Sequence, residues 1–325
     1  MRENGLFFEG SIDVKKTKML TEGALLAAVF GIFVLVLSYV PLIGPVAIFF
    51  LILPFLIFCS KYPLKYLIVF SAACLFISML AGTTALLPFA LLYGGTGFVM
   101  GYCIQLKKSK LFIYLASSLT FLAGLIIGLF VSIKFFHLNI INENLKQLRE
   151  SVNQSRTMLE QFGQQSSIEN LNKMADSMVS LYQIYLPSFL LLFSFLAVFV
   201  LMAVNFPVAK RLGVPVPKWS PYREFRLPKS VLWYYVICLV LSMFIETDAS
   251  SFLSKAVMNL LLIFEILVLM QGFSLINFYS YEKKWPKVFF VMAVIFAIIF
   301  SPLLYLVMIL GIIDIGFDFR RYIRK

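Results

Sequence analysis

Charged residues are scarce in this chain, and histidine is almost absent. Only 14% of the 325 residues are Asp, Glu, Lys or Arg, and His137 is the single histidine. One histidine excludes metal sites of the His-Glu-x-x-His kind. The sequence also lacks a Walker A motif and a Gly-x-Ser-x-Gly elbow, so it predicts neither ATP hydrolysis by that route nor a serine hydrolase. We therefore expect no enzymatic activity, no metal site and no cofactor.

Paired cysteines are missing as well. Cys59, Cys74, Cys103 and Cys238 lie in or near apolar stretches, and no Cys-x-x-Cys motif occurs. Without such a motif or a matching histidine, these side chains are best interpreted as small apolar packing residues.

Hydrophobic residues dominate what is present. They make up 61% of the chain, and the mean hydropathy is +0.92. Apolar runs approach the roughly 20 residues that cross a bilayer. The formal net charge is +12, but the basic residues flank these runs, where anionic lipid headgroups account for them. The sequence predicts an all-α, polytopic membrane helix bundle with the lipid bilayer as its partner, and it predicts no nucleic-acid binding.

The distribution of positive charge gives the expected orientation. About 22 of the 28 Lys and Arg residues fall on alternate connections between apolar spans. Such an excess marks the cytoplasmic side, which places the N-terminus inside a bacterial plasma membrane. The N-terminal segment has no signal-peptide cleavage pattern, so we expect the first span to be retained. The predicted spans are roughly 20–40, 42–60, 64–81, 83–106, 111–136, 184–206, 231–246 and 253–279, followed by an apolar stretch over 288–313.

The last apolar stretch decides between nine and ten spans. As one helix, it would put Arg320, Arg321, Arg324 and Lys325 outside, against the charge rule. Pro302 lacks the helical N–H and disfavours helix at Ser301, so it could divide the stretch into two crossings. We favour ten spans, with a single kinked span as the alternative. Asp314, Asp318, Arg320 and Arg321 are expected to form a local charged cluster at the inner face.

The segment 137–182 is unlike the rest, because polar residues alternate there with apolar residues at 3-4 spacing. This spacing predicts an extracytoplasmic hairpin of two helices with a coiled-coil seam. Gly163 suits the turn, and Ser166 with Glu169 fits a capping box for the second arm. The hairpin either docks other envelope proteins or only joins two spans. The seam residues are Leu138, Ile141, Leu145, Leu148, Val152, Leu159 and Phe162, then Ile168, Leu171, Ala175, Met178, Tyr182 and Tyr185.

The connection 209–230 is basic and rich in proline, which rules out a long helix. Its aromatic residues alternate with Arg223, Arg226 and other basic residues, a composition that suits the headgroup layer. It is predicted either to anchor at the membrane surface or to dock a partner through Arg223 and Arg226.

Small residues at four-residue spacing indicate close helix packing. The first span carries Ala24-x-x-x-Ala28 and Ala27-x-x-x-Gly31. Later spans carry Gly97-x-x-x-Gly101 and Gly124-x-x-x-Gly128. Packing within the chain is the default interpretation of each pattern.

Polar residues within apolar spans are candidate functional residues, because burying them costs free energy. Glu265 lies near the middle of the eighth span, with Asn259, Gln271 and Asn277 on the same helix. Glu265 is interpreted either as a structural hydrogen-bonding group or as a proton-coupling or substrate-contacting carboxylate, and Gln271 as a substrate contact.

Three short motifs carry a resemblance to a known family. They are the residues 20–28 (LTEGALLAA), Phe225-Arg226-Leu227-Pro228, and Gly311-Ile312-Ile313-Asp314 with Asp318-Phe319-Arg320. Together they resemble the YybS family of bacterial multi-pass membrane proteins, which have no established biochemical function.

The first six spans also resemble the S components of energy-coupling factor vitamin transporters. In that family an Ala-x-x-x-Ala stripe docks onto a transmembrane coupling subunit that works with ATPases. The resemblance implies this role for Ala24 and Ala28. The outer hairpin and the added C-terminal spans depart from an S component.

The leading hypothesis is a small-molecule binding or transport subunit that uses the polar, glycine-rich region of Thr83, Thr84, Tyr93, Gly95 and Thr96. The alternatives are a non-transporting envelope scaffold or regulator, and a proton-coupled carrier that depends on Glu265. The predicted organisation is a cytoplasmic N-terminus (1–19), a six-helix unit (20–208) that includes the hairpin (137–182), a cytoplasmic loop (209–230), C-terminal membrane helices (231–317) and a basic tail (318–325).

Overall fold

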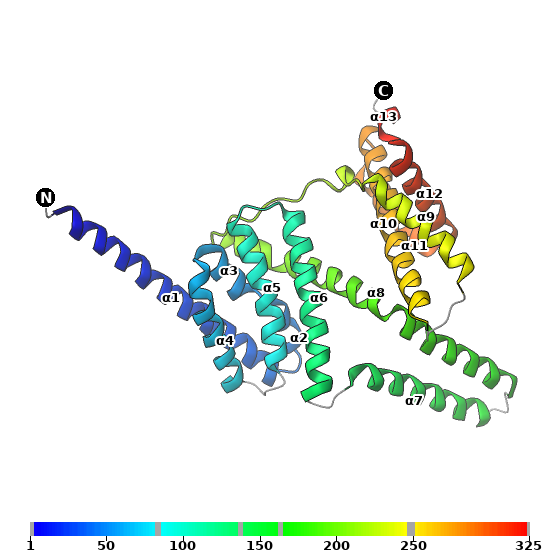
Figure 1. Cartoon of the computed structure of the whole chain (residues 1–325), viewed down its shortest axis with the longest axis horizontal. Helices are drawn as coiled ribbons and strands as arrows, with labels where there is room; N and C mark the ends of the chain where they lie inside the picture. The colour runs from blue at the N-terminus through cyan, green and yellow to red at the C-terminus, as the bar shows by residue number, and fades with distance from the viewer. Residues whose placement is uncertain (1–2, 82–85, 136–138, 162–164, 246–250, 324–325) are drawn as a thin grey trace. The chain divides into compact units, whose positions relative to one another are not determined.

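The structure is a computed structural model that describes residues 3–81, 86–135, 139–161, 165–245 and 251–323 (Figure 1). These residues form helices and connecting turns, without a strand, which confirms the all-α prediction. The helices are α1 (Glu3–Tyr39), α2 (Gly44–Ala47), α3 (Leu53–Lys61), α4 (Leu67–Ala81), α5 (Leu87–Gln105), α6 (Lys110–Phe135), α7 (Ile140–Gln161), α8 (Gln165–Arg211), α9 (Lys229–Phe244), α10 (Phe252–Glu282), α11 (Lys287–Ile299), α12 (Ser301–Phe317) and α13 (Arg320–Ile323), with short 3-10 turns at η1 (Ile48–Phe50), η2 (Leu64–Tyr66) and η4 (Tyr222–Glu224).

Seven helical segments among the described residues are long and apolar enough to cross a membrane. They are Lys16–Tyr39, Gly44–Lys61, Leu64–Ala81, Leu87–Gln105, Lys110–Lys134, Ile168–Arg211 and Phe252–Glu282. The polytopic membrane fold is therefore confirmed. The predicted count of nine to ten spans is too high by this measure, because α9 has only 16 residues and the last apolar stretch is broken.

The last apolar stretch, 288–313, is broken next to Pro302, as the sequence predicts. Helices α11 and α12 meet at Phe300 with a bend of 120°. Pro302 occupies the first turn of α12, where a missing N–H costs least. Together they count as at most one further span, which would raise the total to eight.

The chain forms two compact units. The first comprises residues 1–140 and 190–219, and the second comprises 141–189 and 220–325. Helix α8 belongs to both, since it runs without interruption from Gln165 to Arg211.

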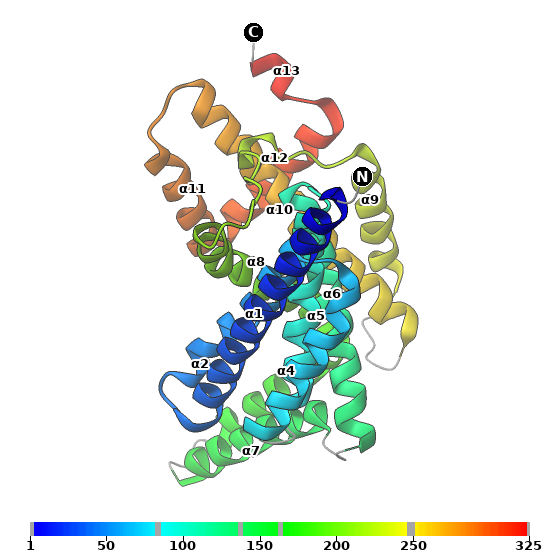
Figure 2. The ribbon, with the colours of Figure 1, turned by 90° about the vertical axis from the view of Figure 1, so that its left-hand side faces the viewer.

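In the first unit, α1 packs against α2, α3 and α4. Figure 2 shows α1 with α2 and α4. A buried aromatic cluster lies between them, with Phe30 edge-on to Phe55 and Phe58 stacked on Phe70 at a centroid distance of 4.3 Å. Such pairs add to the free energy gained by burying the rings.

The small-residue patterns of the first unit have different environments. Gly97 and Gly101 allow α5 to approach α3 closely, because a Cβ there would lie 2.6 Å from the Ile52 carbonyl oxygen and 2.5 Å from that of Leu56. Packing within the chain is thus confirmed for this pair. Gly128 faces open space, so Gly124-x-x-x-Gly128 is not a paired contact in this structure.

The second unit contains a closer helix crossing that the predictions did not include. Added Cβ atoms would lie 2.0 Å from the Val307 carbonyl oxygen at Gly272, and 2.2 Å from the Val268 carbonyl oxygen at Gly311. Helices α10 and α12 therefore meet backbone to backbone, which only glycine permits.

The predicted hairpin segment is helical on both described arms, α7 and the first part of α8. Most seam residues are half-buried and Ile168 is buried, as the 3-4 spacing predicts. Met178 is an exception, since it is 50% exposed while Val179 is half-buried. A straight helix repeats every 3.6 residues, whereas a coiled-coil seam repeats every 3.5. The residue that faces inward is therefore shifted by one position, from Met178 to Val179. Leu138, Phe162, Gly163 and the side chain of Ser166 lie outside what the structure describes.

Asn259 of α10 interrupts the hydrogen bonding of α8 just beyond Pro187. In a regular helix the Ser188 N–H would donate to the Ile184 carbonyl. Here the Ser188 N–H donates to Asn259 Oδ1 at 2.8 Å, and Asn259 Nδ2 donates to the Ile184 carbonyl at 2.6 Å. The buried amide thus replaces one backbone hydrogen bond of α8 and joins the two helices within the second unit.

Candidate functional site

Three of the predicted small-molecule residues of the first unit, Tyr93, Gly95 and Thr96, lie on α5. Thr96 is fully buried, and its hydroxyl donates to the Leu92 carbonyl of the same helix at 2.7 Å. Tyr93 is half-buried and lies edge-on to Phe121. Gly95 faces open space. Thr83 and Thr84 lie outside the described residues. A substrate role for this group remains a prediction, and the Thr96 hydroxyl already has a partner within α5.

The two small-residue stripes of α1 face different surroundings. Ala27 and Gly31 are buried, and Gly31 lies so close to α4 that a Cβ there would be 2.8 Å from the Ile77 side chain. Ala24 and Ala28 are exposed. One stripe packs within the chain, and the other is free to meet lipid or another protein.

Glu265 and Gln271 of α10 are not brought together. Glu265 is half-buried, whereas Gln271 is 2% exposed. Both ends of the Gln271 amide have protein partners, since Nε2 donates to Asp314 Oδ2 and Oε1 accepts from the Leu227 N–H. The Gln271 amide is thus hydrogen-bonded within the chain, and a substrate role for Gln271 stays a prediction.

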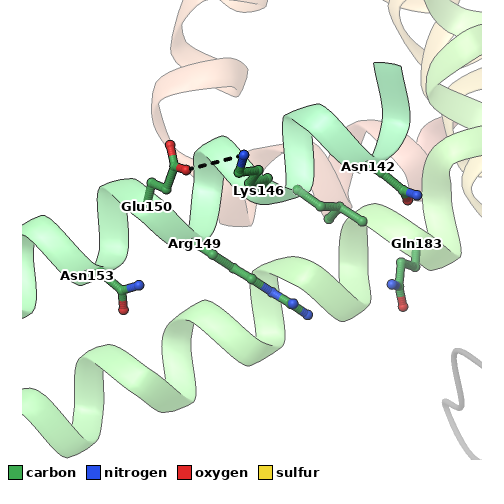
Figure 3. Close-up of a pocket in the computed structure, with 7 residues that line it drawn as sticks. Asn142, Lys146, Arg149, Glu150, Asn153 and Gln183 are labelled. Atoms are coloured by element: carbon green, nitrogen blue, oxygen red, sulfur yellow. Dashed lines mark ion pairs between the residues drawn. The ribbon is translucent and has the colours of Figure 1, made fainter. Parts of the chain in front are cut away.

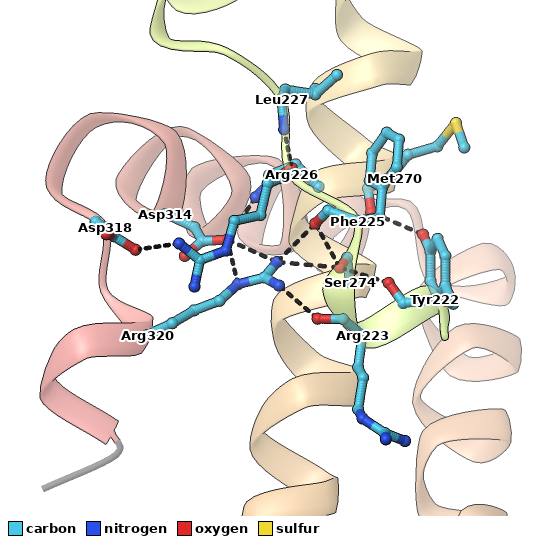
Figure 4. Close-up of polar contacts among 11 residues, drawn as sticks. Tyr222, Arg223, Phe225, Arg226, Leu227, Met270, Ser274, Asp314, Asp318 and Arg320 are labelled. Atoms are coloured by element: carbon cyan, nitrogen blue, oxygen red, sulfur yellow. Dashed lines mark hydrogen bonds and ion pairs between the residues drawn. The ribbon is translucent and has the colours of Figure 1, made fainter. Parts of the chain in front are cut away.

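A buried polar cluster forms where α10, α12 and α13 meet the chain after residue 220 (Figure 4). We call Gln271, Ser274, Asp314 and Arg320 the Arg320 cluster. The Arg320 side chain is 1% exposed, and its Nε donates to Asp314 Oδ2 at 2.9 Å. Its Nη2 donates to Ser274 Oγ at 3.0 Å. A buried guanidinium is tolerated because its charge is paired and its N–H groups have acceptors.

The Arg320 cluster holds the loop 222–227 in place. Arg320 donates to the carbonyl oxygens of Arg223 and Phe225, and Gln271 accepts from the Leu227 N–H. Backbone polar groups that would otherwise lack partners are thereby satisfied. A loop with four prolines in its wider segment gains a defined conformation in this way.

Tyr222 fixes the start of the same loop. Its hydroxyl donates to the Met270 carbonyl at 2.7 Å, and its ring lies against Phe290. Burial raises the pKa of the Tyr222 phenol to about 12, although the nearby Arg320 charge opposes this shift. The phenol is therefore neutral near pH 7 and acts as a hydrogen-bond donor.

The rim of the cluster is charged and open. Arg226 pairs with Asp318 at 2.9 Å, and Asp318 also pairs with Arg321 at 2.7 Å. The guanidinium of Arg223 stacks 3.7 Å above the Tyr281 ring centre. A cavity of about 270 Å³ lies beside these groups and is lined by Arg223, Glu224, Arg226, Phe278, Tyr281, Glu282 and Arg320.

The local charged cluster expected at residues 314–321 is confirmed by the pairs of Asp314 with Arg320 and of Asp318 with Arg321. Its burial and its contacts with Ser274 and Gln271 were missed, because nothing in the spacing along the chain links residues more than 40 positions apart. Two of the motifs that resemble the YybS family, 225–228 and 311–320, meet here, and this was the available signal.

Two further cavities lie along the hairpin arms, with volumes of about 490 and 410 Å³. Both are lined by Arg149 and Asn153, and Arg149 extends from α7 toward α8 (Figure 3). The seam residues Leu148, Val152 and Ala175 line the second cavity. The arms are therefore less closely packed than a continuous coiled-coil seam predicts.

Comparison with known proteins agrees with the motif resemblance. The uncharacterized protein YybS of Bacillus subtilis (strain 168) is 29% identical over 311 residues, which cover 96% of this chain and 100% of that protein. No solved structure matches the chain. The likeness to S components stays a prediction. A family described as predicted membrane protein (DUF2232) matches residues 28–315, and the chain therefore belongs to this family.

Proposed function

We propose that this multi-pass membrane protein is an S-component-like subunit that binds or transports a small molecule together with partner proteins. The observation that carries the proposal is the exposure of Ala24 and Ala28 on α1, while Ala27 and Gly31 of the same helix are buried within the chain. Small exposed residues in a membrane helix allow a second helix to approach closely.

The proposed partner is a transmembrane coupling subunit with its ATPases, at a bacterial plasma membrane with the N-terminus inside. The chain has no Walker A motif of its own. A non-enzymatic subunit of this kind would depend on the partner for energy. The resemblance of the first six spans to S components supports the same arrangement.

Gentle-detergent capture of tagged protein from its native membrane, followed by mass spectrometry, tests the proposal. We expect a coupling-type membrane subunit and ATPases to be recovered. Ala24→Trp and Ala28→Trp should each abolish this recovery, because a large ring prevents close helix contact. Ala73→Trp is the matched control, since Ala73 is also exposed but lies on α4. Recovery that survives both α1 substitutions, or that is lost equally in the control, would contradict the proposal.

A non-transporting envelope scaffold is the second candidate, and the two hairpin cavities favour it. Their walls combine apolar seam residues with Arg149, Asn153 and Asn172, as in an interface that is not filled by the chain itself. In this case the hairpin, rather than α1, would contact the partner.

Deleting residues 142–176 separates the two candidates. A scaffold should lose its captured envelope proteins and show no ligand-induced thermal shift in a metabolite screen. A transport subunit should keep its coupling partner and its ligand response. Arg149→Glu is a milder second variant, because it reverses one exposed charge on α7 without shortening the chain.

A further inference from the structure

We propose that the cavity at the end of α10 binds a phospholipid headgroup that carries both a phosphate and a primary ammonium, as in phosphatidylethanolamine. This inference does not depend on the transport proposal. It rests on the position of the cavity, on the charges that remain unpaired in its wall and on its size.

The cavity lies at the depth expected for lipid headgroups. Phe278, Tyr281 and Glu282 in its wall belong to the last turns of α10, where the membrane-spanning segment Phe252–Glu282 ends. Tyr279 and Trp285 nearby are 38% and 49% exposed, and the Lys283 ammonium lies 5.9 Å from the Tyr279 ring centre. Exposed aromatic and basic residues of this kind are typical of the membrane interface.

Two of the three arginines that line the cavity already have a carboxylate partner. Arg320 pairs with Asp314, and Arg226 shares Asp318 with Arg321. Arg223, Glu224 and Glu282 have no ion pair among the described residues. The cavity therefore offers one unpaired cation and two unpaired carboxylates.

This set of charges favours a zwitterionic ligand over a simple anion. Arg223 is held by its stack on Tyr281, and that geometry leaves the edge of the guanidinium able to donate to phosphate oxygens. The two carboxylates would repel an anionic headgroup. They can accept hydrogen bonds from a primary ammonium, which has three N–H donors.

The volume of the cavity is suited to a lipid headgroup. About 270 Å³ is just below the usual range of pockets for drug-sized ligands. Phe278 and Tyr281 supply an apolar wall for the glycerol region of a lipid.

The test measures lipid binding to the purified full-length protein by native mass spectrometry and thermal shift. Phosphatidylethanolamine, phosphatidylcholine and phosphatidylglycerol with identical acyl chains are added to separate samples. We expect phosphatidylethanolamine to bind at least about fivefold more tightly than either of the others. Phosphatidylcholine has the same charges but no ammonium N–H, and phosphatidylglycerol has the phosphate alone. Equal binding of all three lipids, or a preference for phosphatidylglycerol, overturns the proposal.

Variants assign the roles within the cavity. Glu282→Gln should remove the preference for phosphatidylethanolamine over phosphatidylcholine. Arg223→Gln should instead weaken the binding of all three lipids. Glu143→Gln and Lys229→Gln are matched controls, since both residues are exposed and neither lines the cavity. Water-soluble glycerophosphoethanolamine distinguishes a free headgroup from a lipid. If it bound as tightly as phosphatidylethanolamine, the proposal of a lipid site would be overturned.

Discussion

Arg320 connects three separate parts of the second unit through one side chain. It pairs with Asp314 of α12, donates to Ser274 of α10 and donates to two carbonyl oxygens of the loop 222–227. A buried ion pair adds little net stability relative to an apolar pair, but removing one partner leaves the other charge buried and unpaired.

Replacing Arg320 should therefore destabilise the protein strongly. We expect Arg320→Met to lower the free energy of unfolding by about 3–5 kcal/mol, because the Asp314 carboxylate loses its ion pair. Equilibrium unfolding in detergent measures this change. Limited proteolysis should also show faster cleavage within the loop 222–227, whose carbonyl groups lose their donor.

Arg321 provides the control for this experiment. Its side chain is 82% exposed, although it pairs with Asp318. Arg321→Met should change the unfolding free energy by about 1 kcal/mol or less, as is usual for surface ion pairs. Equal effects of the two substitutions would show that the burial of Arg320 does not matter.

Tyr222 should make the stability depend on pH in the alkaline range. Burial raises the pKa of its phenol in the folded state to about 12, from an ordinary value near 10. Between these values the unfolded chain loses the phenolic proton while the folded chain keeps it. The contribution of Tyr222 is thus complete below about pH 10 and is lost as pH rises toward 12.

Comparison of the unmodified protein with Tyr222→Phe isolates this contribution. The variant should be less stable by about 1 kcal/mol at pH 8, because it lacks the hydrogen bond to the Met270 carbonyl. Its unfolding midpoint should then fall less steeply than that of the unmodified protein between pH 10 and 12. Parallel curves would exclude Tyr222 as the titrating group.

Sequence patterns predicted part of this site, namely the charged residues at 314–321. They could not predict that Gln271 and Ser274 complete it, because this depends on the crossing of α10 and α12 at Gly272 and Gly311. The protein partners of Gln271 could not be predicted for the same reason, since they lie on other segments of the chain.

At the scale of elements, the link between α8 and α10 depends on the amide of Asn259. This side chain is 7% exposed and uses both its oxygen and its nitrogen to satisfy backbone groups of α8. Pro187 has no N–H to donate within α8, and the Asn259 amide takes the place of the next backbone hydrogen bond, between Ser188 and Ile184.

Asn259→Leu should destabilise the protein, because two buried backbone groups of α8 lose their partners. We expect a loss of about 1–3 kcal/mol for a group left unsatisfied. Hydrogen exchange at the Ser188 amide should become faster. Both changes can be measured on the same purified variant.

Asn277→Leu is the matched control on α10, because Asn277 is only half-buried and lies toward the other end of the helix. It should leave exchange at Ser188 unchanged. If Asn259→Leu also left that exchange unchanged, α8 would have re-formed its own hydrogen bond and Asn259 would not be required to protect the Ser188 amide.

The helical elements themselves were predictable, because apolar runs and 3-4 spacing depend only on local sequence. Among the seam residues that the structure describes, the prediction differs by one position at Met178, where Val179 is half-buried instead. Its cavities were not predicted, since spacing gives the face of a helix but not its distance from the next one.

At the scale of the whole molecule, α11 and α12 determine on which side of the membrane the chain continues. Helix α11 has 13 residues and spans about 20 Å, less than the roughly 30 Å hydrocarbon core. The 120° bend turns α12 back toward the side from which α11 starts. The two ends of this pair should therefore face the same aqueous compartment.

Cysteine labelling with a membrane-impermeant reagent checks this expectation. Lys287→Cys and Arg321→Cys should be labelled from the same side, and Phe252→Cys at the start of α10 from the opposite side. The four native cysteines are buried, so their background labelling should be low. Labelling of positions 287 and 321 from opposite sides would instead indicate one continuous crossing.

The contacts of Arg320 also impose an order on folding during synthesis. The carbonyl groups of Arg223 and Phe225 are made 97 and 95 residues before the arginine that binds them. A ribosome adds about 5–20 residues each second, so the loop must wait several seconds for its donor. During that interval the carbonyl groups of Arg223 and Phe225 lack their arginine donor. Closure of this unit thus waits for residue 320, so a nascent chain that stops before Arg320 should present the loop 222–227 without these two hydrogen bonds.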